Sequence, residues 1–360
     1  DFPSKKRFIE KVALISQNLH NNGINHRDYY LCHFHVDSNM DVEKEIYLID
    51  LHRAQLRTFV PTRWASKDIG GLFHSAMGFK LNERDFYRFI KTYFNCSLKE
   101  ALETHSKFIR TSRDRAFRMF MKPILREIDI SFSETQKDTS GYLGRKEDNL
   151  RWVAKKKYLS KGLEEIISQI DSYMEKGEII KDEEGHKIIR INLKEDIFVI
   201  KKYKIKGSWH YLRKLFSQTR AFVAWKASHW FNAAGIRTIN IVAVIEKYNF
   251  LSTTDSYLIS LNQPEERLDK VDLNKQQGYL IENRLSSFFK RLEWIGFNHG
   301  DAKSANFFFG NNNLIVSDLD VSKRRYFQFI QKNKLSKDKK RILKSFEDNL
   351  KIKNSLLRRL

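Results

Sequence analysis

Cysteine, proline and glycine are scarce in this sequence of 360 residues, with 2, 4 and 15 copies respectively. Cys32 and Cys96 show no CxxC spacing, which excludes a disulfide framework and a cysteine-based zinc site and fits a reducing cytoplasm. Few prolines and glycines disfavour a sandwich of many short strands. No apolar run reaches the roughly 20 residues that span a bilayer, and no signal-peptide pattern is present, so at most peripheral membrane binding is expected.

Apolar residues and positive charge are instead abundant. Hydrophobic residues make up 41% of the chain, enough for a large core, and a chain of 360 residues favours two domains over one. The net charge is +22, from 66 basic and 44 acidic residues. Such an excess indicates an anionic partner, namely a nucleic acid, an anionic membrane surface or a phosphorylated substrate. A nucleic acid is not expected, because no known nucleic-acid-binding module accompanies the charge.

Hydrophobic periodicity divides the chain into two units. Helical patterns in residues 8–19 and 67–122 surround a short strand-like run at 46–51, which predicts a helical lobe. The polar segment that follows contains Gly141 and Gly144 and predicts a linker.

The second unit begins with strands. Apolar and polar residues alternate over 187–203, with a turn at 194–196, which predicts a small antiparallel sheet. A helix over 217–234, two strands within 239–262 and a further helix from about residue 274 follow. The predicted division is a lobe at 1–126, a linker at 127–150, a unit at 151–330 with lobes 151–265 and 266–330, and a basic helical tail at 331–360. The tail is expected to be solvated, or to lie on anionic lipid through its interleaved apolar residues.

Two loops have the chemistry of phosphoryl transfer. This reaction needs a carboxylate that orients the acceptor hydroxyl, ligands for Mg²⁺ and a cation on the phosphates of ATP. In kinases a His-Arg-Asp triplet followed five residues later by Asn supplies the first group and one metal ligand, and a nearby strand ends in an Asp that supplies another. The five-residue spacing lets one loop present both groups to the same phosphate.

Both units contain this combination. In the first unit NHRDYYLCHF supplies Asp28 and, five residues later, His33, while IYLIDL ends in Asp50. A single His-Arg-Asp triplet is often only a surface turn. The second unit repeats the pattern, and its members are Asp301, Asn306, Asp318 and, as a further possible metal ligand, Asp320.

The first unit resembles the lipopolysaccharide core heptose kinase family, whose members share a protein-kinase-like fold. The resemblance is carried by NHRDYYLCHF, IDLHRAQ, RWASKDIGGLFHSAMGF and ERDFYRFIKTYF. It covers residues 8–126 and matches the catalytic lobe without the lobe that grips the nucleotide. It implies Asp28 as catalytic base, Asp50 as Mg²⁺ ligand, and His33 at the position where protein kinases have a nucleotide-site Asn.

The same resemblance implies the rest of the reaction. ATP and Mg²⁺ are expected as cofactors, with a heptose or Kdo of the lipopolysaccharide inner-core precursor as acceptor. The expected location is the cytoplasmic face of the inner membrane, where the anionic membrane surface would attract a cationic protein. The sequence would then begin inside a first kinase, and residues 1–126 by themselves would be inactive because they lack an ATP lysine.

The second unit is more loosely similar to the wider lipopolysaccharide kinase group. Its IFVIKKY resembles the strand with the ATP lysine, which implies Lys201 as nucleotide ligand, Asp301 as catalytic base and Asp318 with Asn306 as metal ligands. The fold class is therefore α+β, a helical catalytic lobe followed by a second, two-lobed kinase-like domain.

Two departures keep alternatives open. The helix at 217–234 has no acidic residue to pair with Lys201, and no glycine-rich phosphate loop is evident. The second unit is alternatively a pseudokinase or scaffold, and a protein Ser/Thr kinase would share the loop chemistry. The aromatic stripe is expected in the core, and it comprises Phe216, Phe222, Trp225 and Trp230. Cys32 is expected to be a small buried side chain.

Overall fold

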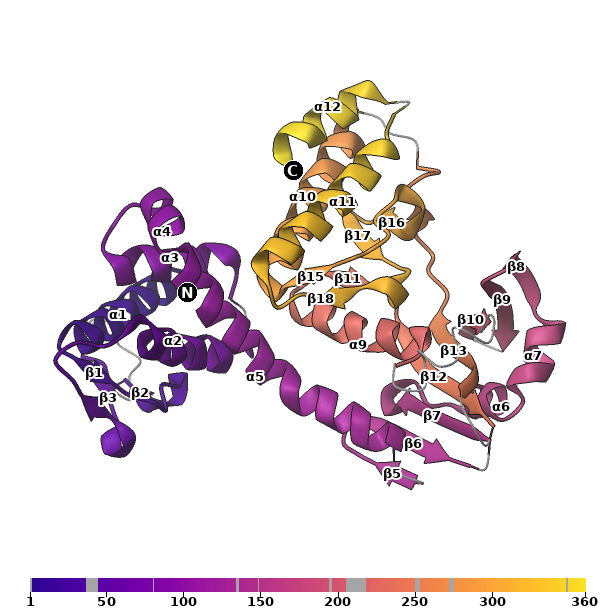
Figure 1. Ribbon diagram of the computed structural model, residues 1–360, viewed down its shortest axis with the longest axis horizontal. Coiled ribbons are helices and arrows are strands. Elements are labelled where there is room, and N and C mark those ends of the chain that lie inside the picture. The colour runs from indigo at the N-terminus through magenta and orange to yellow at the C-terminus, as the bar shows by residue number, and fades with distance from the viewer. Residues whose placement is uncertain are drawn as a thin grey trace. The chain divides into compact units, whose positions relative to one another are not determined.

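The computed structural model describes residues 2–36, 45–79, 81–133, 136–147, 149–193, 196–204, 218–249, 253–271, 275–347 and 349–360. It consists of two compact units, Asp1–Lys122 and Pro123–Leu360, and the division falls inside helix α5 (Ser106–Ser133) (Figure 1). Among the described residues, no helix is both long and apolar enough to cross a membrane.

The first unit is helical. Its helices are α1 (Phe2–Asn21), α2 (Thr62–Ala76), α3 (Glu83–Phe94), α4 (Leu98–Thr104) and the N-terminal part of α5. Apolar side chains recur on one face of each helix and form one core, in which Ile69 and Ile90 are completely buried. Helix α3 starts with a capping box, because the side chains of Asn82 and Asp85 each accept the other residue's backbone N–H.

Two short strand pairs hold the loops of the first unit. Strand β1 (Ile24–Asn25) pairs with β4 (Gln55–Leu56), and β2 (Phe34–His35) pairs with β3 (Tyr47–Leu48), both antiparallel. The 3-10 turns Leu31–His33 and Leu51–Arg53 lie between these strands. The predicted strand at 46–51 is thus shorter in the structure, but it brings Asp50 to the edge of the loop that contains Asp28.

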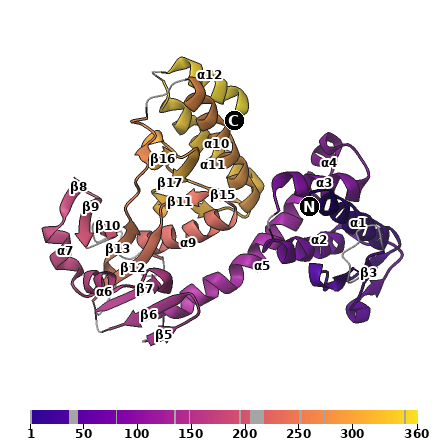
Figure 2. The ribbon, with the colours of Figure 1, turned by 180° about the vertical axis from the view of Figure 1, so that it is seen from behind.

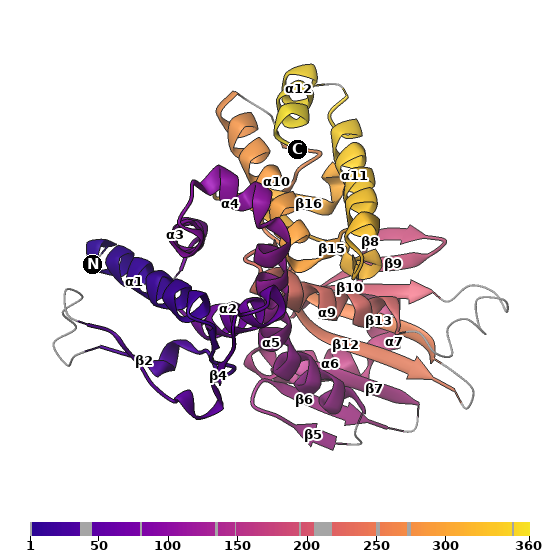
Figure 3. The same ribbon diagram turned by 60° about the vertical axis from the view of Figure 1, so that its left-hand side comes forward.

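The second unit is built on an eight-stranded antiparallel sheet in the order β5-β6-β7-β12-β13-β10-β9-β8 (Figure 3). The strands are β5 (Gln136–Asp138), β6 (Tyr142–Lys146), β7 (Leu150–Lys155), β8 (Glu178–Glu183), β9 (His186–Leu193), β10 (Asp196–Lys204), β12 (Ile241–Tyr248) and β13 (Thr253–Leu261). The helices that pack on it are α6 (Lys161–Ser168), α7 (Ile170–Lys176) and α9 (Arg220–Ala233). Helices α6 and α7 share a core with one face, which includes Ile200, and α9 packs on β12 and β13 from the other face (Figure 2).

The predicted linker at 127–150 is wrong, because most of it is ordered in the second unit. The end of α5 and strands β5 and β6 occupy this segment, and β6 pairs with β7 along five residues. Gly144 is a packing residue in β6, since a Cβ atom there would lie 1.6 Å from the carbonyl oxygen of Ser131 in α5. The polar composition therefore belongs to an edge of the sheet.

Five of the strands have the topology of a kinase nucleotide lobe. Strands β8, β9, β10, β13 and β12 are neighbours in that order, and α9 connects β10 to β12. Lys201 thus stands on the third of these strands, where kinases have their ATP lysine. Residues 194–195 of the turn predicted at 194–196 lie outside the described residues, as do Phe216 and Ser217. The other aromatic residues of the α9 stripe are buried, as predicted, and are Phe222, Trp225 and Trp230.

A mainly helical lobe follows. It contains α10 (Lys275–Ile295), α11 (Gln328–Lys344) and α12 (Leu350–Arg359). Its short strands are β11 (Arg237–Thr238), β14 (Glu266–Arg267), β15 (Phe297–Asn298), β16 (Phe307–Gly310), β17 (Asn313–Val316) and β18 (Lys323–Arg324).

The predicted separate tail at 331–360 is instead part of this lobe. It forms most of α11 and all of α12, which pack on α10, and Ile342 and Leu356 are completely buried. Apolar side chains at helical spacing explain this packing, because burial removes them from water. The second unit therefore extends from Pro123 to Leu360, well beyond the predicted limits of 151 and 330.

Candidate active site

In the first unit, His33 connects the two predicted aspartates. Its Nδ1 donates to the backbone carbonyl oxygen of Asp28 at 2.8 Å, and its Nε2 lies 3.5 Å from Oδ2 of Asp50. The Nε2 atom of His26 is 3.0 Å from the carbonyl oxygen of Ile49, the residue before Asp50. Asp50 itself has a left-handed backbone, with φ of 64°, a conformation that is uncommon for residues other than glycine.

The second unit repeats these bonds with its own residues. Asn306 donates from Nδ2 to the carbonyl oxygen of Asp301 at 2.7 Å and to the Asp301 carboxylate at 3.0 Å. His299 Nε2 is 3.0 Å from the carbonyl oxygen of Ser317, and the next residue, Asp318, is again left-handed, with φ of 59°. His33 and Asn306 therefore occupy equivalent places in the two loops.

A buried aspartate supports each loop from a helix behind it. Asp68 in α2 accepts the backbone N–H groups of His26 at 2.7 Å and Arg27 at 3.0 Å. Asp338 in α11 accepts the N–H of Gly300 through both carboxylate oxygens, at 3.1 and 3.0 Å.

Two further bonds are also repeated. Seven residues after each aspartate a serine hydroxyl accepts a loop N–H, Ser75 from Leu31 at 2.8 Å and Ser345 from Ser304 at 3.1 Å. The guanidinium groups of Arg57 and Arg325 donate to asparagine side chains next to the loop histidines. These supporting side chains were not predicted from the sequence. The spacing of seven residues between Asp and Ser, which occurs in both units, could have indicated them.

The loop histidine of the second unit is neutral. Burial lowers the pKa of His299, against the opposing effect of Asp338 and other nearby groups. Its Nδ1 accepts the backbone N–H of Asp301 at 3.3 Å, so Nε2 must hold the proton that is donated to Ser317. This tautomer fixes the Asp301 loop to the segment with Asp318.

Lys201 is held by Asp318. The ammonium group forms an ion pair with Oδ1 of Asp318, and both side chains are largely buried. Burial alone would raise the pKa of Asp318, but Lys201, His299 and His186 together hold it below its usual range. The lysine and the strand-end aspartate that the sequence predicted are thus in contact.

Helix α9 offers a cation instead of the usual carboxylate. It contains no acidic residue, and its first residue, Arg220, forms an ion pair with Asp320. Asp320 therefore lies against α9. This contact does not support its predicted role as a second metal ligand, which stays a prediction.

The two candidate bases have different neighbours. Arg53 donates to both carboxylate oxygens of Asp28, at 2.9 and 2.8 Å. In the second unit Lys303 lies 3.1 Å from the Asp301 carboxylate. Cys32, expected to be buried, is exposed, so its place beside the loop is at the surface.

Within the described parts of the chain, no cluster of three or more His, Cys, Asp or Glu side chains is arranged to hold a metal ion. The donors near Lys201 nevertheless suit magnesium, which prefers carboxylate and amide oxygens and binds through one or two carboxylates plus substrate phosphates. Asp318 supplies such a carboxylate. Asn306 uses its nitrogen for Asp301, which leaves its amide oxygen as an acceptor for a cation.

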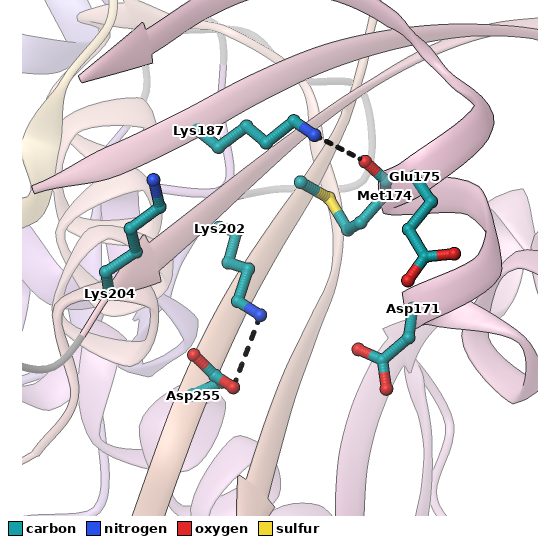
Figure 4. Close-up of a pocket in the computed structure, with 7 residues that line it drawn as sticks. All are labelled: Asp171, Met174, Glu175, Lys187, Lys202, Lys204 and Asp255. Atoms are coloured by element: carbon teal, nitrogen blue, oxygen red, sulfur yellow. Dashed lines mark hydrogen bonds and ion pairs between the residues drawn. The ribbon is translucent and has the colours of Figure 1, made fainter. Parts of the chain in front are cut away.

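A pocket of about 500 Å³ in the second unit lies away from these residues. Figure 4 shows its lining, which consists of Asp171, Met174, Glu175, Lys187, Lys202, Lys204 and Asp255. Lys202 follows Lys201 on β10, so its side chain points to the opposite face of the sheet. It forms an ion pair with Asp255 at 3.3 Å, and Lys187 donates to the carbonyl oxygen of Met174 at 2.9 Å. This pocket is thus separate from the candidate active site.

Fold and site together define a protein-kinase-like protein with two catalytic lobes. The model of the Lipopolysaccharide kinase (Kdo/WaaP) family matches residues 3–93, which confirms the resemblance of the first unit. The chain is 40% identical over 131 residues to the lipopolysaccharide core heptose(I) kinase WaaP of Escherichia coli, covering 36% of this chain and 49% of that protein. It is 37% identical over 119 residues to WaaP of Pseudomonas aeruginosa, covering 32% and 44%. The chain thus spans about half the length of the curated relatives it matches.

Two solved structures are similar at low scores. One is WaaP in complex with acyl carrier protein, with a TM-score of 0.42 and 16% identity over 56% of this chain and 86% of that chain. The other is a Rio2 kinase complex from Chaetomium thermophilum, with a TM-score of 0.38 and 12% identity over 69% and 79%. Scores this low leave the fold assignment to the strand order and loop geometry described above.

Proposed function

We propose that this protein transfers the γ-phosphate of ATP to a sugar hydroxyl, a heptose or Kdo, of the lipopolysaccharide inner core. The observation that carries the proposal is the contact between Lys201 and Asp318 beside the Asp301 loop. It joins two of the three groups that phosphoryl transfer needs, a cation for the phosphates and a carboxylate for the metal. The third group, the base Asp301, is on the loop that His299 connects to the segment with Asp318. The relatives of the first unit supply the acceptor class, since they are named heptose(I) kinases.

Each group has a defined task in the proposed reaction. Asp301 accepts the proton of the sugar hydroxyl, and Asn306 fixes its carboxylate by donating to it at 3.0 Å. Lys201 binds the α- and β-phosphates. Asp318 and Asn306 would hold Mg²⁺, which neutralises charge on the triphosphate when bound. In the first unit Asp28, Asp50 and His33 would play the corresponding parts, with Nε2 of His33 in place of the asparagine oxygen.

The Lys201–Asp318 ion pair also keeps both side chains in place for the binding of nucleotide and cation. Without nucleotide, each neutralises the other in a largely buried site. A triphosphate offers Lys201 a stronger anionic partner and frees Asp318 for a cation. Nucleotide and cation should therefore bind together more tightly than either does alone.

The test is phosphate transfer by the full chain. Purified protein is incubated with labelled ATP and either core oligosaccharide or a mixture of Ser/Thr peptides, and label in each acceptor is counted. Asp301→Asn should lower sugar labelling by about 10² to 10⁴-fold, the range for loss of a general base. Asp28→Asn is the matched change in the other lobe and separates the two units. Equal labelling by wild type and both variants, or labelling of peptides alone, would refute the sugar-kinase proposal.

A scaffold role for the second unit is the other candidate. Acidic residues stand where kinases cover the phosphates with glycines, because Asp182 and Glu183 end strand β8. They pair with Lys204 and Lys181, both at 2.8 Å. Carboxylates at this position, even when paired with lysines, favour a triphosphate less than glycine backbone N–H groups would, and the missing helix carboxylate adds to this argument. A scaffold should bind ATP with no dependence on Mg²⁺, which calorimetry of the full chain with and without the metal would reveal.

An anionic membrane surface is the proposed docking partner. Three aromatic side chains follow β18 and are strongly exposed, Tyr326 at 82%, Phe327 at 64% and Phe329 at 72%. Lys323 and Arg324 precede them, and aromatic rings beside cations are typical of segments at the membrane interface. This segment takes the place of the tail, in which Ile342, Phe346 and Leu356 are buried and only Leu357 is strongly exposed among the described apolar residues. It would put the lobe that contains Asp301 near a lipid-linked acceptor.

A further inference from the structure

The N-terminus of α9 joins the sheet to the turn that follows Asp318. On the sheet side, the Thr219 hydroxyl caps the helix and donates to Glu246 of β12, and Arg151 of β7 donates to the same carboxylate at 2.8 Å. On the other side, Arg220 forms an ion pair with Asp320 in the 3-10 turn Leu319–Val321. Polar contacts thus run from β12 through α9 to the catalytic lobe.

This connection ends beside the Lys201–Asp318 pair. Lys201 and Arg220 both stack on the ring of Tyr203, each with its charged group 4.9 Å from the ring centre. Asp318 and Asp320 are two residues apart in the same turn, and one carboxylate meets each cation. Tyr203 is buried, and its hydroxyl has no hydrogen-bond partner among the described residues, so the ring contributes mainly as a platform for the two cations.

We propose that Arg220 and Asp320 form a positioning pair that places Asp318, and through it Lys201, for phosphoryl transfer. The inference rests on the proposed function. In kinases a helix carboxylate orients the lysine directly. Here the helix supplies the cation and the turn supplies the carboxylate, so α9 acts on the lysine through Asp318.

The energetics favour this role. The Asp320 side chain is only 2% exposed, so it depends on its cation. Asp318 has a left-handed backbone, which residues other than glycine adopt rarely, although aspartate adopts it more readily than most, so the contacts around the turn help to keep it there. Without Arg220, the Asp320 carboxylate would turn toward water, and the turn would release Asp318 from its position.

The experiment compares two cations on α9 in the full chain. Arg220→Ala removes the cation at the turn, and Lys226→Ala removes a cation that instead pairs with Asp129 at 2.6 Å. Calorimetry measures ATP affinity with and without Mg²⁺, and hydrogen exchange follows peptides that span residues 317–322. Arg220→Ala should weaken Mg²⁺-dependent ATP binding by about 10 to 100-fold, as for loss of a residue that orients a metal ligand. Exchange in the turn should accelerate, and Lys226→Ala should change neither.

Two conservative variants protect the test against misfolding. Arg220→Lys keeps the charge and should retain most of the Mg²⁺-dependent affinity, while Asp320→Asn should resemble Arg220→Ala. Suppose that the wild type binds ATP with Mg²⁺ and that Arg220→Ala and Lys226→Ala behave identically. This result would overturn the positioning pair and leave the proposed function intact. A wild type with no Mg²⁺-dependent binding would overturn the proposed function and the pair's part in it. Exchange in the turn would then still show whether α9 holds it.

Discussion

Replacing Asp338 by alanine should destabilise the second unit, and replacing Asp68 should destabilise the first unit about twice as much. Both carboxylates are about 1% exposed and bind only loop backbone groups and neighbouring side chains. Asp338 takes one N–H, that of Gly300, whereas Asp68 takes those of His26 and Arg27. The His26 N–H is buried and those of Arg27 and Gly300 are partly buried, and each that loses its charged acceptor costs up to about 2 kcal/mol.

The expected losses follow from this count. Asp338→Ala should cost about 2 kcal/mol and Asp68→Ala about 4 kcal/mol in free energy of unfolding. Each carboxylate also has a side-chain neighbour. Arg341 lies 3.2 Å from Asp338, but it is half exposed, so that ion pair adds less than about 1 kcal/mol. Nε2 of the buried His20 lies 3.4 Å from Asp68, which adds to the larger loss expected there. Asp338→Asn keeps an acceptor oxygen and should lose less than Asp338→Ala.

Hydrogen exchange in a urea series measures this prediction, because peptides from each unit report the unfolding of that unit separately. Asp114→Ala is the control, since its ion pair with Arg118 is on the surface of α5 and should contribute at most about 0.5 kcal/mol. Two results would refute the idea that these carboxylates hold the loops by accepting their backbone N–H groups. One is a loss of unfolding free energy in Asp68→Ala that is no larger than in Asp338→Ala, and the other is a loss in both variants equal to that of the control.

Two further predictions concern pH and lipid. Burial, with Lys155 nearby, lowers the pKa of His229 to about 4 from 6.5. The unfolded chain therefore binds a proton in that interval that the folded chain does not, so stability of the second unit should fall by about 3 kcal/mol as pH drops through it. In urea titrations at several pH values, His229→Gln should show a smaller fall in stability. The same dependence of stability on pH in wild type and variant would count against this role of His229. Phe327→Ser should weaken sedimentation of the protein with anionic vesicles. Tyr279→Ser, which changes a residue 58% exposed on α10, should not. Equal effects of the two variants would refute the proposal that the segment with Phe327 binds the membrane.

The helical lobe, the two-lobed second unit and the pair of loops could be predicted from the sequence. Helical periodicity in the first unit and alternation in the second are local patterns, and they survive in α1 to α5 and in β9 and β10. The linker and the tail could not be predicted correctly, because polar composition does not tell an exposed loop from a sheet edge. Gly144 illustrates this, since only the backbone of α5 above it explains why it is glycine.

The sequence by itself determined which groups share a loop. Asp301 and Asn306 are five residues apart, as are Asp28 and His33, and the covalent chain keeps such pairs close in any compact state. Only the tertiary structure decided that Lys201 meets Asp318 across 117 residues, and that Arg220 of α9 takes Asp320. Contacts of this kind depend on how the sheet, α9 and the catalytic lobe pack, and their partners share no spacing or pattern that a local physical rule could detect.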